Sequence, residues 1–322
     1  MEFQKDLLER LVNKGLSQSS ITLYVKNLIK LNDGLPLKNF NFLNNVDSIM
    51  EKLQPLKPTT QKAYLTCIVS VLNTYPENKK IVKLCSKYYA VMNDAVKKLK
   101  EIPSGAMSKT QSENWLDWDK IQDIYKKLHE KVMGFIKNKE ISENQYNTLL
   151  SLVVLSLYVL LPPRRNMDYC LMNVKKSVGD DDKKDKNYLD VDSKKFIFNV
   201  FKTSKDNEDT EIKIPEDLQH IIFDMYFKFH PLLQGKKITK TTDVPFLVYY
   251  NGSKFTAVNC ITRILNKIFD KKIGVSMLRH SYLTAKYGNE DTERKKDAVA
   301  MGHNTQTQSQ YIKNKDIIID FD

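Results

Sequence analysis

The segment LLSLVVLSLYVLLPPRRNMDY, residues 149–169, decides the fold of the larger part of this 322-residue chain. Its first 13 residues, Leu149 to Leu161, are almost all apolar, and the run closes at Pro162. A helix that spans a membrane needs about 20 such residues. This stretch therefore predicts a helix buried in a protein core, followed at once by two arginines and an aspartate.

The sequence on either side of this segment predicts two domains and a linker. Residues before 100 show helical periodicity, whereas IPSGAMSKTQSENW, residues 102–115, is rich in Pro, Gly, Ser and Thr and has no apolar period. We expect a basic helical domain over residues 1–102, a linker over 103–114 and a second domain over 115–322.

The fold class predicted for the whole chain is mainly α, with an α+β second domain. Short alternating runs, YLDVD, KFIFNVF and TEIKI, occur between residues 188 and 214 and predict a small antiparallel sheet. Two helices should open the chain and a third should follow Pro58. Further helices are expected over residues 79–100, from Trp118, over 215–229, over 257–270 and in much of the last part of the chain.

The charge distribution points to a polyanionic partner. The formal net charge is +12, and residues 1–100 hold 16 of the 51 Lys and Arg but only 8 of the 39 Asp and Glu. A basic excess attracts nucleic acid, although a generally Lys-rich composition is the alternative explanation. We expect Lys57 and Lys62, near the start of the helix after Pro58, to contact DNA.

Cysteine and glycine usage bears on cofactors and on the compartment. The four cysteines are dispersed without a CxxC pair, and there is no GxxxxGK run. These patterns predict neither a metal site, nor a disulfide framework, nor a nucleotide-hydrolysing loop, so no cofactor is expected. The charged, amphipathic start differs from a signal peptide, and we expect an intracellular, reducing compartment and no membrane partner.

Three segments of the second domain carry residues suited to phosphate chemistry: PPRRNMDY (162–169), SMLRHSYLTAKYG (276–288) and MGHNTQTQSQYIKNK (301–315). Their order and content resemble the two arginine boxes, the LGH motif and the tyrosine of the tyrosine recombinases. The sequence is most similar to the integrases of large DNA viruses, virophages and Crypton-type mobile elements. The resemblance covers about residues 115–315 by motif, and the first hundred residues resemble the family's core-binding domain only in being basic and helical.

The resemblance implies a fold, an activity and an assembly. The fold is the DNA-breaking-rejoining fold, in which a helical core-binding domain precedes a mainly helical catalytic domain. The activity is that of a site-specific recombinase or integrase, which cleaves and rejoins DNA through a 3′-phosphotyrosyl intermediate without metal or ATP. The partner is duplex DNA, with a homotetramer on DNA and a monomer in solution.

Elementary chemistry explains why such an enzyme needs these residue types. Cleaving a phosphodiester without a metal requires fixed positive donors around the non-bridging oxygens, and the planar fork of arginine grips two oxygens at once. A phenol held in line can then attack, and the leaving oxygen needs a proton. The resemblance assigns phosphate binding to Arg165, Arg279 and His303, attack to Tyr311, and proton donation to Lys202, with Lys205 as the alternative.

The first arginine box offers two adjacent candidates. Arg165 is preferred over Arg164 because Asp168 then lies at the third following position, where the family carries an acidic residue that anchors the turn. Arg164 and Asp168 are expected to support the site. An isolated Arg-Arg pair after a helix is otherwise a common way to end that helix.

Two features depart from the family pattern. Ser276 stands where many members have His or Lys, and a hydroxyl brings no charge, so either the site is weaker or His280 compensates. The interval from His303 to Tyr311 is eight residues, one shorter than is usual in the bacterial and phage enzymes.

Two alternatives to a recombinase remain open at this point. A type IB topoisomerase-like enzyme shares the phosphate clamp and the tyrosine but reseals the same strand. The apolar run IIIDF, residues 317–321, could pack on another subunit and so favours the recombinase. The other alternative is a catalytically weakened DNA-binding relative, for which Ser276 is the warning sign.

Overall fold

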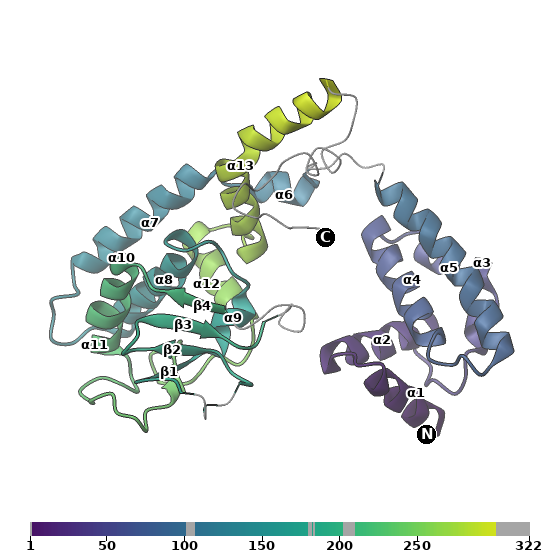
Figure 1. The fold of residues 1–322 in the computed structure, drawn as a ribbon, viewed down its shortest axis with the longest axis horizontal. Coiled ribbons are helices and arrows are strands. Elements are labelled where there is room, and N and C mark those ends of the chain that lie inside the picture. The colour runs from purple at the N-terminus through teal and green to yellow at the C-terminus, as the bar shows by residue number, and fades with distance from the viewer. Residues whose placement is uncertain (1, 101–106, 180–181, 183, 202–209, 301–322) are drawn as a thin grey trace, which may run out of the picture. The chain divides into compact units, whose positions relative to one another are not determined.

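The computed structural model describes residues 2–100, 107–179, 182, 184–201 and 210–300 (Figure 1). The chain divides into two compact units, Met1–Ala106 and Met107–Asp322. Each unit has its own cluster of buried apolar side chains. The predicted domain boundary at residue 102 lies outside the described residues.

The first unit is a small bundle of helices. α4 packs against both α2 and α5, and Leu65 and Ile68 of α4 are fully buried between them. Pro58 begins α4, where its missing N–H costs no hydrogen bond. The helices predicted after Pro58 and over 79–100 are confirmed. The elements are α1 (Glu2–Asn13), α2 (Gln18–Leu31), the 3-10 helix η1 (Asn41–Leu43), α3 (Val46–Leu53), α4 (Pro58–Leu72) and α5 (Lys79–Lys100).

The second unit is built around a five-stranded sheet with the strand order β4-β3-β2-β1-β5. The three predicted strands, β2, β3 and β4, pair antiparallel as expected. β5 also pairs antiparallel with β1, but β1 pairs with β2 in parallel, so the whole sheet is mixed rather than antiparallel. The two strands that the sequence did not predict, β1 and β5, have only three and two residues, too few to show alternation. The strands are β1 (Asn173–Lys175), β2 (Tyr188–Asp190), β3 (Lys195–Phe198), β4 (Thr210–Lys213) and β5 (Val244–Pro245).

Helix α8 is the apolar helix predicted from the sequence, and it lies in the core with α7 and α12 packed against it. A short helix, α6, occupies part of the expected linker, where the side chains of Ser108 and Gln111 form a capping box. No helix in the described part of the chain is long and apolar enough to cross a membrane. The helices are α6 (Lys109–Asn114), α7 (Trp118–Met133), α8 (Glu143–Val159), α9 (Asn166–Cys170), α10 (Glu216–Gln219), the π-helix η2 (His220–Tyr226), α11 (Phe227–Phe229), α12 (Asn259–Phe269) and α13 (Val275–Ala300).

Asn187, just before β2, holds two distant segments together. Its Nδ2 donates to the carbonyl oxygens of Asp168 and Val200, both at 2.9 Å, and its Oδ1 accepts from the backbone N–H of Val200 at 2.8 Å. The residue is only 5% exposed, so these bonds also satisfy a buried amide. The backbone of α9 is thereby fixed beside the segment that follows β3.

All four cysteines are free thiols and all are buried. Burial raises the pKa of Cys67 to about 12 and that of Cys170 to about 11. Burial acts in the same direction on Cys260, but hydrogen bonds from Tyr249 and from backbone groups outweigh it and lower the pKa of Cys260.

His230 is fully buried and both of its ring nitrogens are used. Nε2 lies 3.1 Å and 3.2 Å from the carbonyl oxygens of Pro245 and Phe246, so it carries the proton, whereas Nδ1 accepts from the backbone N–H of Leu232 at 3.2 Å. Burial lowers the pKa of His230 to about 4. A second proton would have to enter at Nδ1, which already faces a donor.

This histidine should make the second unit less stable in acid. The unfolded chain takes up the proton near pH 6.5, and the folded chain only near pH 4. The contribution of neutral His230 is therefore complete above about pH 6.5 and is lost as the pH falls towards 4, by about 3 kcal/mol in total. Urea unfolding of the wild type and of His230→Gln at several pH values measures this loss. The difference between the two proteins should shrink in acid, and a difference that is constant with pH would contradict the assignment.

Candidate functional site

Arg164 is part of the local fold at the end of the buried helix. Its Nε donates to Oδ2 of Asp168 at 2.8 Å, and its guanidinium lies over the ring of Phe198 at 4.0 Å and over that of Phe201 at 5.3 Å. Asp168 is only 3% exposed. Burial raises the pKa of Asp168, and the charges of Arg164 and Arg165 oppose this rise.

Arg165 differs from its neighbour because its side chain makes no such contacts with the described residues. It is the N-cap residue of α9, is half-buried, and accepts the backbone N–H of Asp168 on its carbonyl oxygen at 3.0 Å. Its guanidinium makes no hydrogen bond or ion pair with any residue that the structure describes. A half-exposed cation without an internal partner is available to bind an anion.

Asn166, the residue after Arg165, ties the start of α9 to two other helices, α8 and α12. Its Oδ1 accepts from the hydroxyl of Tyr158 on α8 at 2.8 Å. Its Nδ2 donates to Oγ1 of Thr262 on α12 at 3.0 Å and to the carbonyl oxygen of Val258 at 3.3 Å. Because all of these groups are buried or half-buried, α9 can start in only one place relative to α8 and α12.

The same threonine also adjoins the start of α13. A Cβ added to Gly274, the residue before α13, would lie 3.8 Å from Cγ2 of Thr262. Thr262 therefore bonds to Asn166 at the start of α9 and lies close to Gly274, the residue before α13.

One face of α13 packs into the second unit. Leu278 is fully buried, and the hydroxyl of Ser281 donates to the carbonyl oxygen of Leu116 at 2.7 Å. The ring of Tyr282 meets Trp118 edge to face, with 5.2 Å between the ring centroids. These contacts set the rotation of the helix about its axis.

A different face of α13 carries the predicted site residues. Ser276, Arg279 and His280 are spaced i, i+3 and i+4, which places them side by side on one face. Ser276 and His280 are exposed, and Arg279 is half-buried. None of the three side chains bonds to another residue in the described ranges. Arg279, like Arg165, is thus free to meet an anion.

Several predicted residues lie outside the part of the chain that the structure describes. These are Lys202, Lys205, His303 and Tyr311.

The first unit carries two of the predicted DNA contacts. Lys57 and Lys62 are exposed, and neither has an ion-pair partner among the described residues. They lie at the start of α4, whose first turn holds no acidic residue. Cations near the positive end of a helix dipole are unfavourable for the helix alone, so these two lysines do not serve to stabilise α4.

Asn166 and Asn187 are the two residues around the candidate site whose structural role the sequence did not reveal. Their hydrogen-bond partners include groups far away in the chain, such as Thr262, 96 residues from Asn166. No local pattern signals such a role. An asparagine directly beside a predicted arginine box is the only hint in the sequence.

Comparison with protein-family models and with curated proteins finds no match for this chain. Within the described ranges, no three His, Cys, Asp or Glu side chains are grouped so that they could hold a metal ion.

Proposed function

We propose that this protein is a site-specific DNA recombinase or integrase of the tyrosine recombinase kind, which cuts one strand by forming a 3′-phosphotyrosyl bond at Tyr311. The observation that carries this proposal is the difference between two adjacent arginines. The guanidinium of Arg164 contacts Asp168 and Phe198, whereas that of Arg165 has no hydrogen-bond or ion-pair partner among the described residues. Arg279 of α13 has no such partner in the described ranges either.

Two free guanidinium groups are the chemical requirement for a metal-free phosphate clamp. Arg165 and Arg279 would neutralise the non-bridging oxygens, and His303 would donate a third hydrogen bond. Their charge favours the pentavalent transition state over the ground state, since the phosphoryl group carries more negative charge there. The phenolic oxygen of Tyr311 would give up its proton to solvent, attack in line, form the bond to phosphorus and displace the 5′ oxygen.

The proton for the leaving oxygen would come from Lys202, or from Lys205. Phe201, the residue before Lys202, lies 5.3 Å from the guanidinium of Arg164. Asn187 also fixes Val200 beside Asp168. The segment that leads to Lys202 thus starts next to the first arginine box, which supports this assignment.

The proposed substrate is duplex DNA, bound by both units and without a metal or ATP. Strand exchange between two duplexes needs four cleavage events, so we propose a homotetramer on DNA and a monomer when free. Four free, buried thiols are compatible with work in a reducing compartment inside a cell.

The decisive experiment looks for the covalent intermediate. Duplexes that the protein binds are first selected from a random pool and sequenced. The selected site is then rebuilt with a nick close to each possible cleavage position, so that the short product diffuses away and the enzyme stays trapped on DNA. A recombinase gives a protein–DNA adduct on a denaturing gel, joined to the 3′ phosphate and leaving a free 5′ hydroxyl.

Other results would identify the alternatives. Specific binding without any adduct would indicate a weakened relative, as the uncharged Ser276 beside Arg279 allows. An adduct together with plasmid relaxation, but no exchange between two duplexes, would indicate a type IB topoisomerase-like enzyme.

Removing Lys57 and Lys62 should reduce the salt dependence of duplex binding. The logarithm of affinity falls with the logarithm of salt by about 0.9 per neutralised phosphate, so Lys57→Gln/Lys62→Gln should flatten the slope by nearly 2. Fluorescence anisotropy at salt concentrations between about 50 and 300 mM measures this slope. The control is Lys236→Gln/Lys237→Gln, which removes the same charge from an exposed turn. Equal slopes for both variants would exclude Lys57 and Lys62 from the interface.

A further inference from the structure

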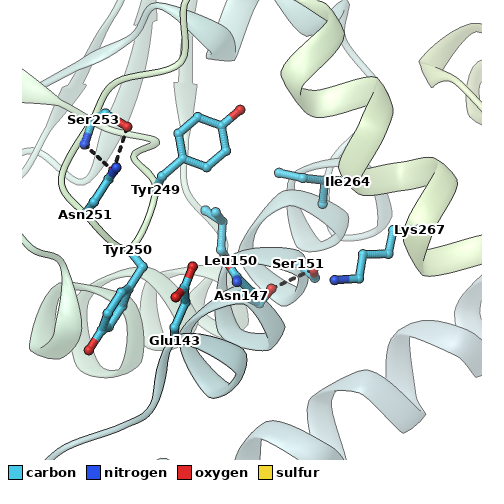
Figure 2. Close-up of a pocket in the computed structure, with 10 residues that line it drawn as sticks. All are labelled: Glu143, Asn147, Leu150, Ser151, Tyr249, Tyr250, Asn251, Ser253, Ile264 and Lys267. Atoms are coloured by element: carbon cyan, nitrogen blue, oxygen red, sulfur yellow. Dashed lines mark hydrogen bonds between the residues drawn. The ribbon is translucent and has the colours of Figure 1, made fainter.

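A polar groove crosses the first turns of α8. It consists of two neighbouring cavities of about 620 Å³ and 480 Å³, the first between α8, α12 and the 249–253 loop (Figure 2) and the second between α7, α8 and α12. Asn147, Ser151 and Lys267 line both cavities, so the two lie side by side along α8. We call this feature the α8 groove.

The α8 groove is separate from the proposed phosphate clamp. Asn147 and Val159 are 12 residues apart on α8, which corresponds to about 18 Å along a helix. Arg165 lies beyond the end of that helix. Ligands in the groove would therefore not touch the clamp.

One end of the α8 groove is cationic. Lys127, Lys131 and Lys267 line it and are exposed, and none of them has a hydrogen-bond or ion-pair partner among the described residues. Lys127 and Lys131 are also i, i+4 neighbours on α7, an arrangement of like charges that costs free energy unless an anion lies nearby. Glu143 is the one carboxylate among the described lining residues.

The other end is aromatic. Figure 2 shows Tyr250 and Asn251 at the end of the first cavity opposite Lys267. The side chain of Tyr250 is 44% exposed, and its ring rests on the buried ring of Tyr146 with 5.7 Å between centroids. Tyr249 is held in the same way by Phe255, at 4.8 Å. Tyr250 is exposed and Tyr249 is half-buried, and aromatic rings that are fixed from behind in this way are suited to stacking with nucleic-acid bases through their open faces.

Two amide side chains also line the groove, Asn251 at the aromatic end and Asn147 between the two cavities. Oδ1 of Asn251 accepts from the backbone N–H and the hydroxyl of Ser253 at 3.0 Å and 2.6 Å, which leaves its NH2 group to donate elsewhere. The side chain of Asn147 has no hydrogen-bond partner in the part of the chain described. Both amides can bond to base edges or to sugar hydroxyls.

We infer that the α8 groove binds single-stranded nucleic acid, with phosphates at the three lysines and bases on the two tyrosines. A basic groove combined with aromatic platforms is the arrangement that binds such strands without sequence preference. Each cavity alone has the size of a small-ligand pocket, roughly 300–1,000 Å³, so the groove takes more than one nucleotide. An acidic peptide would pair with the lysines but would leave the tyrosine faces and the amides unused.

Binding of a fluorescein-labelled (dT)15 strand to the full chain tests this inference, with excess unlabelled duplex present to occupy any duplex-binding surface. Lys131→Gln/Lys267→Gln should flatten the salt slope by about 1.4, because each phosphate contact on a single strand contributes about 0.7. Tyr250→Ala should weaken binding about tenfold, and Tyr250→Phe should not, since stacking needs only the ring. Lys120→Gln/Lys126→Gln is the charge-matched control on the exposed surface of α7.

Two results would overturn the inference. One is (dT)15 binding that is equal in the wild type, the lysine variant and Tyr250→Ala, with folding verified by circular dichroism. The other is a polyglutamate peptide that displaces (dT)15 and loses its binding in the lysine variant but not in Tyr250→Ala. Formation of the covalent adduct with nicked duplex does not depend on this groove. A protein that forms no adduct but binds a single strand through Tyr250 would therefore refute the recombinase proposal and leave the present inference standing.

Discussion

Tyr311→Phe should abolish the covalent protein–DNA adduct, lowering the rate of its formation by about 10⁴ or more, because the attacking oxygen is removed. The ring stays in place and no charge changes, so duplex affinity should remain within about twofold of the wild type. Denaturing gels with the nicked substrate measure the adduct, and anisotropy measures the affinity.

The matched control for this variant is Tyr287→Phe. Tyr287 is an exposed tyrosine of α13, 44% accessible, and its hydroxyl has no role in the proposed reaction. The wild type and Tyr287→Phe should form adduct equally. An adduct that persists in Tyr311→Phe would show that another residue attacks the phosphate.

Arg165→Ala should slow cleavage without changing stability, whereas Arg164→Ala should lower the stability of the fold. Arg165 has no internal partner among the described residues, so its loss should change stability by no more than about 0.5 kcal/mol but should slow cleavage by about 10²–10³. Arg164→Ala leaves the carboxylate of Asp168 buried and unpaired, which should cost about 3–5 kcal/mol of folding free energy. Thermal unfolding and single-turnover cleavage separate the two effects.

One result would contradict the roles assigned to Arg164 and Arg165. Should Arg164→Ala fold normally and lose cleavage while Arg165→Ala stays active, the assignment of the two arginines is reversed. Arg165→Lys adds a further check, because a lysine keeps the charge but cannot grip two oxygens, and it should recover only part of the rate.

Long elements with a strong apolar period were predictable from the sequence. α5, α7 and α8 appear where periodicity placed them, since each buries a continuous apolar face. α3 was missed because it is only eight residues long. β1 and β5 carry too few residues for any pattern, and the parallel pairing of β1 with β2 depends on contacts between segments far apart in the chain.

The sequence predicts which residue types form the proposed site, but not the contacts that surround them. Spacing alone allowed either Arg164 or Arg165 to pair with Asp168, because three and four residues both suit a short helical turn. The turn after Pro163 decides the matter, since it directs Arg164 towards Asp168 and Phe198. Asn166 could not be recognised in advance, because Thr262 and Val258 approach it only in the folded chain.

The burial of every thiol makes the protein suited to site-directed labelling. Maleimides react with accessible thiolates, so Cys67 and Cys170 should stay unlabelled in the native state. Replacing Cys260, whose thiolate forms most readily, with serine would reduce labelling at the native cysteines. One new cysteine on the outer surface of each unit could then carry a donor and an acceptor dye, and energy transfer between them would test whether adding duplex DNA changes the distance between the units.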